Sequence, residues 1–301
     1  MLKYRYRLGR QTYERAQTVT AAVLLLPTLA ALGFLFVYPV LRVFALSFTS
    51  TNTITNVSRW IGVKNYTFLL GNQMFRRAFL NTCWFTVGKL TGEVIISLML
   101  AVLLDMDVPW RKWLRVSYFA PVIVPVVAAS TIWMWLYDPT LGPLNAALRF
   151  LGLPISNYIF SAESALQSIV VFAVWRGVGY DIIIFLSGLQ GISEDVVEAA
   201  RMDGANEWRI LTRIKLPLMR PIIAFVIMMG MIGCFQAFTE VDIMTQGGPN
   251  NATILMVNYI YNQAFGNAKM GRGAAASVLL FAVIFVLTLL QKLAGDRKEA
   301  R

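Results

Sequence analysis

Two charged side chains, Lys89 and Glu93, lie four residues apart inside a long apolar run of the sequence. On a helix this spacing places both on one face, where an ammonium and a carboxylate can pair. A charged group in an apolar run is costly and therefore marks a functional hypothesis. We interpret the two residues as a structural ion pair that faces protein; a role in contacting a solute is the alternative.

A second apolar run contains the sequence VWRGVGYD at positions 174–181. The rings of Trp175 and Tyr180 could stack on the apolar face of a sugar, and Gly177 would let a ligand approach the backbone. The guanidinium of Arg176 is suited to a phosphate, carboxylate or sulfonate. Its alternatives are extension toward the membrane surface, or an ion pair with Asp181, Glu240 or Asp242.

A third apolar run has small residues at i, i+3, i+4 and i+7, which leaves one helix face without bulk. That face could give room to a ligand, or it could pack tightly against another helix, as small residues often do in membranes. Two nearby polar residues, Gln236 and Glu240, are further candidates for solute contact. The four small residues are Gly230, Gly233, Cys234 and Ala237.

The composition excludes several kinds of chemistry. There is no histidine, which removes the commonest general base and metal ligand. The two cysteines, Cys83 and Cys234, both fall in apolar runs and make neither a disulfide framework nor a zinc site. No GxxxxGK[ST] phosphate-binding loop occurs. We therefore predict no catalytic residue, no metal site and no cofactor bound by this chain.

The elements that carry these residues are predicted to span a membrane. Of the 301 residues, 57% are hydrophobic and 14% are charged, whereas soluble domains carry about 25% charged residues. A helix needs about 20 mostly apolar residues to cross a bilayer. The first apolar run is too long for a signal peptide and lacks a cleavage site. We predict an all-α membrane protein with six transmembrane helices, at roughly 19–46, 79–104, 114–137, 165–190, 218–241 and 273–292.

Basic residues orient these spans. Seventeen Lys and Arg residues fall in the N-terminal tail, the loops 105–115 and 191–220, and the C-terminal tail, whereas seven fall in the loops on the opposite side. This positive-inside asymmetry places both termini in the cytoplasm. It also accounts for the net charge of +11 without a nucleic-acid partner.

The stretch EAARMDGANEWRILTRIKLP, positions 198–217, is polar although it lies between two predicted spans, on the cytoplasmic side. Ser193 can cap a helix that stops at Gly204. Asn206 can cap a second helix, which we expect to end at Leu216-Pro217. Two short helices would then meet at a glycine corner. Such a pair could lie on lipid headgroups or fit a groove of a partner protein, and the physical chemistry leaves both open.

This stretch resembles the EAA loop of bacterial ABC importer permeases at every position of the motif. The matching residues are Glu198, Ala199, Ala200, Gly204, Ile214, Leu216 and Pro217, and the run MDGA at 202–205 is also typical of the family. A second block begins with TQGGP at 245–249 and continues through Thr253, Leu255, YIY at 259–261 and AF at 264–265. It resembles the carbohydrate uptake branch, with permeases of the maltose and glycerol-3-phosphate type. The resemblance covers about residues 20–295.

The resemblance implies the type I ABC importer permease fold in a bacterial inner membrane. Residues 1–18 and 293–301 would be cytoplasmic tails, and 19–292 the permease domain, with a coupling loop at 191–217. That loop would sit in a cleft of a cytoplasmic ATPase dimer, which uses ATP and Mg. The other implied partners are a second homologous permease and an extracytoplasmic solute-binding protein. The ATPase-coupling residues would be Glu198, Ala199, Ala200, Asp203, Gly204, Ile214, Leu216 and Pro217. The alternative is a stand-alone secondary carrier or channel.

The resemblance also bears on the solute. In the maltose permease, the positions that match Arg176, Gly177 and Tyr180 contribute to the sugar site, as do those of the small face at 230–237. Arg176 stands where that permease has an apolar residue, and the glycerol-phosphate permease has a basic one. The small face lacks the polar side chains frequent in the family, which disfavours a maltose-like disaccharide. A neutral sugar and an anionic solute both stay open. We assign the pair Trp133/Trp135 to an interfacial belt.

Overall fold

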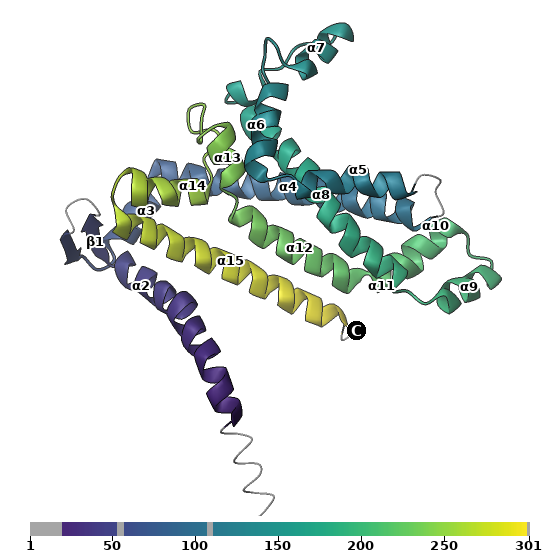
Figure 1. Cartoon of the computed structure of the whole chain (residues 1–301), viewed down its shortest axis with the longest axis horizontal. Helices are drawn as coiled ribbons and strands as arrows, with labels where there is room; N and C mark the ends of the chain where they lie inside the picture. Colours follow the sequence, from purple (N-terminus) through teal and green to yellow (C-terminus); the bar gives the residue numbers. More distant parts are fainter. Residues whose placement is uncertain (1–19, 53–56, 107–110, 300–301) are drawn as a thin grey trace, which may run out of the picture.

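The computed structural model describes residues 20–52, 57–106 and 111–299 (Figure 1). The predicted tail 1–18 lies outside these residues. The described chain is almost entirely helical, with one antiparallel hairpin in which Thr49 pairs with Trp60. The elements are η1 (Gly33–Val37), α2 (Tyr38–Ser47), β1 (Thr49–Asn52), β2 (Val57–Trp60), α3 (Lys64–Gly71), α4 (Gln73–Asp105), α5 (Arg111–Ile123), α6 (Val126–Leu136), α7 (Pro143–Phe150), η2 (Tyr158–Phe160), α8 (Ala165–Gln190), α9 (Glu194–Met202), α10 (Glu207–Ile210), η3 (Leu211–Lys215), α11 (Leu216–Leu218), α12 (Arg220–Phe235), α13 (Thr239–Met244), α14 (Met256–Tyr261), η4 (Asn262–Gly266) and α15 (Met270–Glu299).

Four helices in the described part of the chain are long and apolar enough to cross a membrane. They are Thr20–Ser47, which contains η1 and α2, then α4, α8 and the stretch Met270–Gly295 of α15. Two bent helix pairs have the composition of a span when each pair is counted as one, which gives up to six candidates. Long helices thus occupy four of the six predicted positions. The predicted C-terminal tail, 293–301, begins as a continuation of α15, which runs to Glu299.

The predicted transmembrane segment over 114–137 is not one continuous helix, although its two parts together have the composition of a span. The chain forms α5 and α6, whose segments Val116–Ile123 and Val126–Leu136 meet at 109°. Pro125 stands at the break, with φ −54° and ψ 134°. Proline has no N–H to donate and pushes the residue before it out of the helical region, so the helix stops here. Pro121 is accommodated inside α5.

The prediction of a continuous span over 218–241 also needs correction. Helix α12 ends at Phe235 and a separate helix, α13, follows. Val241 and Met244 of α13 are buried in one cluster with Ala129 of α6 and Tyr137 just beyond it. This packing against α6 holds α13 apart from the end of α12. Glu240 consequently lies in the first turn of α13.

The core is organised around the contact between α4 and α8. One apolar cluster combines Ala101 and Leu104 of α4 with Ile182 and Phe185 of α8 and Val226 of α12. Helix α12 packs against α4, and α15 runs beside α12 (Figure 1). Helix α5 reaches α8 where Gly179 faces the carbonyl oxygen of Tyr118, a position that any side chain would obstruct. Close packing of helices through small residues is common in membranes.

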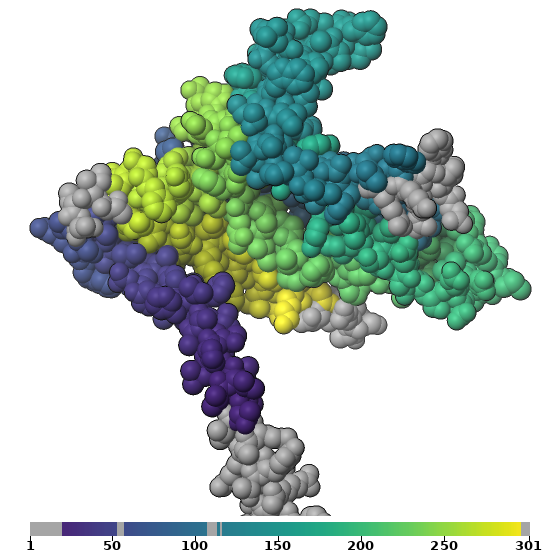
Figure 2. All heavy atoms as spheres, in the orientation of Figure 1, coloured from purple at the N-terminus to yellow at the C-terminus, as the bar shows by residue number. Residues whose placement is uncertain are grey.

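Helix α6 leads into an arm, residues 137–164, that projects from the bundle (Figure 2). The backbone N–H of Leu141 donates to the carboxylate of Asp138 at its start, and this bond holds the pKa of Asp138 below its ordinary value. Asn145 is fully buried, accepts the N–H of Ser156 at 3.0 Å and donates back to the carbonyl of that residue at 2.8 Å. The arm is therefore a folded unit held by its own hydrogen bonds.

The first helical segment, Thr20–Ser47, stands largely apart from the bundle, as Figure 2 shows. Its end is fixed by Asn65 of α3, whose side-chain amide donates to the carbonyls of Ser47 at 2.8 Å and Thr49 at 2.9 Å. Asn65 is buried, with 4% of its surface exposed. A buried amide that satisfies two carbonyls is costly to remove, because both acceptors would lose their donor.

We expect Asn65→Ala to lower the free energy of unfolding by about 1–3 kcal/mol, since it leaves these carbonyls without partners. Reversible unfolding in mixed detergent–SDS micelles, followed by tryptophan fluorescence, measures the change. Thr67→Ala is the control, because its hydroxyl makes an exposed bond to the Lys64 carbonyl. Equal stability of the two variants would contradict the assignment.

Candidate functional site

The predicted coupling loop, residues 191–217, forms two short helices that meet at Gly204. Helix α9 ends where Gly204 adopts φ +79°, a left-handed conformation that glycine tolerates. The N–H groups of Gly204 and Ala205 each close the helix end with a 3.0 Å bond, to the carbonyls of Arg201 and Ala200. The predicted stop at Gly204 is confirmed.

The two helix starts in the loop differ. The side chain of Asn206 accepts the N–H of Arg209 at 2.8 Å, so the predicted cap of α10 is confirmed. Ser193 occupies the N-cap position of α9 but makes no capping bond to the backbone. Its hydroxyl lies 3.3 Å from the carboxylate of Asp195. The capping bond predicted for Ser193 is therefore absent.

The second helix does not end at Leu216-Pro217 as predicted. It continues through Pro217 to Leu218, and a 63° bend at Met219 separates Glu207–Leu218 from α12. The preceding turn, η3, is π-helical, and the N–H of Leu216 bonds to the carbonyl of Leu211. A wide π turn accommodates a local change in the hydrogen-bond ladder, such as the missing donor of a proline.

The two halves of the coupling loop face different surroundings. No residue of α9 is buried, and Met202 is 88% exposed. Ile210 in the second half is fully buried, and Leu211 and Ile214 are half-buried against the bundle. Figure 1 shows α9 and α10 at the end of the bundle opposite β1. Of the predicted coupling residues, Glu198, Ala199, Asp203 and Gly204 are exposed, whereas Ala200, Ile214, Leu216 and Pro217 are half-buried.

Two ion pairs fix this corner. The guanidinium of Arg201 and the carboxylate of Glu207 are 3.0 Å apart across the glycine, and both side chains are more than half exposed. The ammonium of Lys215 lies 2.6 Å from the carboxylate of Asp105, with 21% and 16% of the side chains exposed. Asp105 is not among the residues predicted from the sequence. The feature that could have indicated it is an acidic residue at the C-terminal end of a long apolar helix, where the helix dipole disfavours negative charge.

The predicted solute contacts of α8 lie on partly accessible surface. Trp175 is 40% exposed and Tyr180 is 60% exposed. The Nε of Arg176 is buried and has no hydrogen-bond partner among the described residues. Within the same part of the chain, no carboxylate of Asp181, Glu240 or Asp242 forms an ion pair with Arg176. The pairing considered as an alternative for Arg176 is therefore not found.

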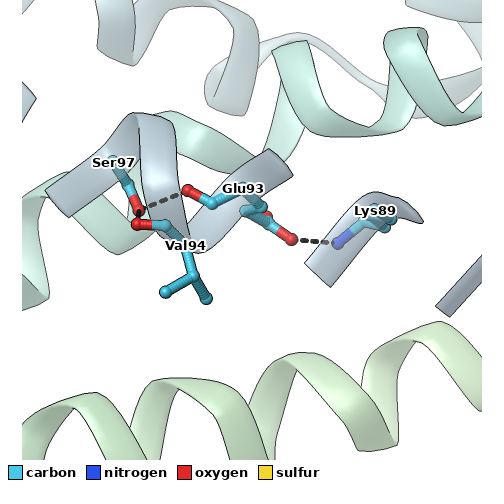
Figure 3. Close-up of polar contacts among 4 residues, drawn as sticks. All are labelled: Lys89, Glu93, Val94 and Ser97. Carbon is cyan, nitrogen blue, oxygen red and sulfur yellow. Dashed lines mark hydrogen bonds and ion pairs between the residues drawn. The ribbon is translucent and has the colours of Figure 1, made fainter. Parts of the chain in front are cut away.

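The predicted pair Lys89–Glu93 is confirmed (Figure 3). Glu93 is 4% exposed, and its backbone carbonyl accepts the hydroxyl of Ser97. The Glu93 carboxylate lies over Gly177 of α8, where a Cβ atom would overlap it. Gly177 thus provides the space in which the ion pair sits between α4 and α8.

The small face of α12 divides into two parts. A Cβ atom on Gly230 would meet the side chain of Leu90, and Cys234 and Ala237 are buried in a cluster with Phe85. These three residues pack against the bundle. Gly233 has no neighbour that a Cβ atom would touch, and Gln236 is exposed, while Glu240 is half-buried. The accessible part of this segment is therefore the side that carries Gly233 and Gln236.

Trp133 packs against the core, and its assignment to an interfacial belt stays a prediction. Its ring is half-buried and lies 5.1 Å from Trp175 and 5.6 Å from Phe172. The packing of α6 against the rest of the core draws it inward, whereas Trp135 is 59% exposed. The structure adds Trp133 to the aromatic surroundings of Trp175, a proximity that needs the bend between α5 and α6.

We expect Gly177→Ala to lower the free energy of unfolding by about 1–3 kcal/mol, because the new methyl group displaces Glu93 from Lys89 and leaves a buried charge without its partner. In a Glu93→Ala background, the same change at Gly177 should cost much less. SDS unfolding of the four variants of this cycle measures the coupling. Gly233→Ala, which meets open space, should leave stability unchanged. If the substitutions at Gly177 and Glu93 lower the free energy of unfolding additively, Gly177 does not have this packing role.

Comparison with known proteins shows which family has this sequence and fold. Residues 93–299 match the model of the family described as binding-protein-dependent transport system inner membrane component. A probable ABC transporter permease protein of Brucella suis is 30% identical over 278 residues, 92% of this chain and 96% of that protein. The arabinooligosaccharides transport system permease of Bacillus subtilis is 32% identical over 87% of this chain and 84% of its own length. The sn-glycerol-3-phosphate transport system permease of Yersinia pestis is 28% identical over 92% and 94%.

The fold has solved counterparts. A chain of a bacterial ABC transporter involved in the import of the acidic polysaccharide alginate superposes with a TM-score of 0.85 at 21% identity, over 96% of this chain and 99% of that one. A second structure holds the alginate transporter in complex with a periplasmic protein carrying an alginate pentasaccharide, at a TM-score of 0.82 and 22% identity. Family model, relatives and fold agree: the chain belongs to the binding-protein-dependent transport system inner membrane components and is a permease subunit of an ABC transporter.

Proposed function

We propose that this chain forms half of the translocation pathway of an ATP-driven importer for a sugar or sugar-like solute. The match to transport permeases over nine-tenths of the chain carries this proposal. The relatives named for arabinooligosaccharides and for sn-glycerol-3-phosphate support the solute class. A stand-alone carrier or channel is not favoured, because it gives the exposed helix α9 no partner.

The proposal includes a topology. The bent pair α5–α6 counts as one span and α12 is the span after the coupling loop, which gives six spans with both termini and the coupling loop in the cytoplasm. The segments 1–18, 19–292 and 293–301 are then a cytoplasmic tail, the permease domain and a second cytoplasmic tail. The distribution of basic residues supports this orientation.

The coupling loop receives the energy. An ATPase dimer, which uses ATP and Mg, draws together when it binds ATP, and a helix seated on each ATPase subunit moves with it as a rigid body. The attached spans then alternate between inward-open and outward-open states around a fixed solute site. This mechanism needs a stiff helix pair with a free face, and α9, with no buried residue, provides one. The further partners are a second permease, which supplies the other half of the pathway, and an extracytoplasmic binding protein, which delivers the solute.

Arg176 favours a solute with an anionic group. Its guanidinium has no acidic partner among the described residues, and its aromatic neighbour, Trp175, is partly accessible. A cation held on a rigid span without a counter-ion binds a phosphate or carboxylate more readily than a hydroxyl. Tyr180, Gly233, Gln236 and Glu240 complete the accessible set of candidate contacts.

Reconstitution tests the function. The chain, its second permease, the ATPase and the binding protein are assembled in proteoliposomes, and uptake is measured with a neutral arabino-oligosaccharide, with sn-glycerol-3-phosphate and with an alginate oligosaccharide. We expect uptake of at least one of these that depends on ATP and on the binding protein. Uptake by the permeases alone, without ATPase, would instead support a secondary carrier.

Gly204→Val should uncouple the ATPase from transport, because a β-branched residue at φ +79° costs roughly 1–2 kcal/mol and distorts the corner. Uptake and ATP hydrolysis are measured together, and co-purification reports on assembly. Gly191→Ala is the matched control in the same loop: Gly191 has φ −80°, and a Cβ atom there makes ordinary contacts. Normal uptake by Gly204→Val would count against the role of the loop.

Arg176→Ala should lower the stimulation of ATP hydrolysis by anionic solutes. The loss should be at least about tenfold larger than the loss of stimulation by the neutral oligosaccharide, because a tenfold difference corresponds to one charge-assisted hydrogen bond. Arg176→Lys retains the charge and should recover part of the response. Stimulation that falls equally for all solutes, or not at all, would rule out an anion site at this residue.

A further inference from the structure

The coupling loop is tied to the bundle at its second half only. Helix α9 buries no residue, whereas Ile210, the residue directly before η3, is fully buried. At the end of η3, the ammonium of Lys215 meets the carboxylate of Asp105, the last residue of α4. These two residues are 110 positions apart in the sequence. The contact therefore joins the coupling loop to a span that is not its neighbour in the chain.

Asp105 is an unusual residue for its position. The C-terminal end of a helix carries partial negative charge from its free carbonyls, so a carboxylate there is destabilising unless a cation compensates it. Lys215 supplies that cation at 2.6 Å. Both side chains are more than three-quarters shielded from solvent, which makes the pair stronger than an exposed one and its disruption more costly. A residue that contradicts the local preference of its helix points to a role beyond helix stability.

The chain connectivity gives the pair its importance. The coupling loop is covalently continuous with α8 at Gly191 and leads into α12 at Met219. A movement of the loop reaches these two spans through the backbone. Helix α4 has no such connection. A cavity of about 200 Å³, lined in part by Val102, Asp105, Trp208, Leu211 and Lys215, lies between its end and the loop. The side chains between the end of α4 and the loop therefore leave space unfilled, and the ion pair connects the two sides of that space.

We propose that Asp105 and Lys215 are positioning residues that transmit the movement of the coupling loop to α4. The proposal rests on the proposed function, in which the ATPase moves the loop. In this proposal the moving loop displaces three spans, α4, α8 and α12, rather than two. Because Glu93 of α4 lies against Gly177 of α8, moving α8 along α4 would bring a bulkier residue of α8 against the buried carboxylate. The second pair, Lys215–Asp105, keeps the two helices in register during the stroke.

The experiment uses the reconstituted importer with whichever of the three solutes is transported. Asp105→Asn and Lys215→Gln should each lower the number of solute molecules taken up per ATP hydrolysed about tenfold, because the end of α4 then follows the loop only through its packing against α8 and α12. The exchanged variant Asp105→Lys with Lys215→Asp should restore the ratio to within about twofold of the unmodified chain, since it re-forms the pair. Lys292→Gln, which removes an exposed charge from α15, is the matched control and should not change the ratio.

A distance measurement separates transmission from simple stability. Spin labels on Leu103 of α4 and Val196 of α9, both exposed, report whether the two move together on ATP binding. We expect their separation to stay constant in the unmodified importer and to change in Asp105→Asn. A constant separation in Asp105→Asn, a coupling ratio unchanged in both single variants, or failure of the exchanged variant to restore the ratio would each overturn the proposal. Absence of ATP-dependent uptake by the unmodified importer would instead refute the proposed function.

Discussion

The close contact between α4 and α8 is the constraint on which the rest of the structure depends. Cβ atoms on Gly88 and Gly92 would lie only 3.2 and 3.1 Å from Val170 and Val174, and Gly177 lies against Glu93 from the other side. Glycines on both helices thus let the backbones approach until Glu93 is enclosed. A carboxylate buried among apolar residues needs a partner, and Lys89 supplies it from the same helix. Helices α5 and α12 then pack onto this pair of spans, and the aromatic group around Trp175 follows.

The same two helices connect the solute candidates to the energy source. Arg176 lies about 22 Å along α8 from Gly191, at 1.5 Å for each residue of an α-helix. Between Gly191 and the corner at Gly204 the chain is helical again after three residues. Nothing in this path is a flexible linker, so a displacement at α9 reaches the middle of α8 with little loss. Only these three residues separate the exposed face of α9 from the helix that carries the accessible face of α8.

Much of this arrangement could be predicted from the sequence, and the failures have a common cause. Local rules gave the long apolar helices, the pairing of Lys89 with Glu93, the stop at Gly204 and the cap at Asn206, because each depends on residues within one turn. The straight helix over 114–137 failed because composition measures apolar length and not direction, although Pro125 was the local sign of a break. The burial of Trp133 and the partner of Asp105 could not be predicted, since both require knowing which distant segment lies beside them.

The two ion pairs made by residues 191–217 differ in their sensitivity to dissolved salt. At physiological ionic strength, charges in water are screened over about 8 Å, and exposed pairs weaken as salt is added, whereas shielded pairs weaken much less. Arg201–Glu207 belongs to the first kind, but the corner it crosses is already held by the backbone at Gly204. Lys215–Asp105, which has no such support, belongs to the second kind. The contact between the loop and α4 should therefore keep its geometry when the surrounding ionic strength changes, as it does in a cell that loses or gains water.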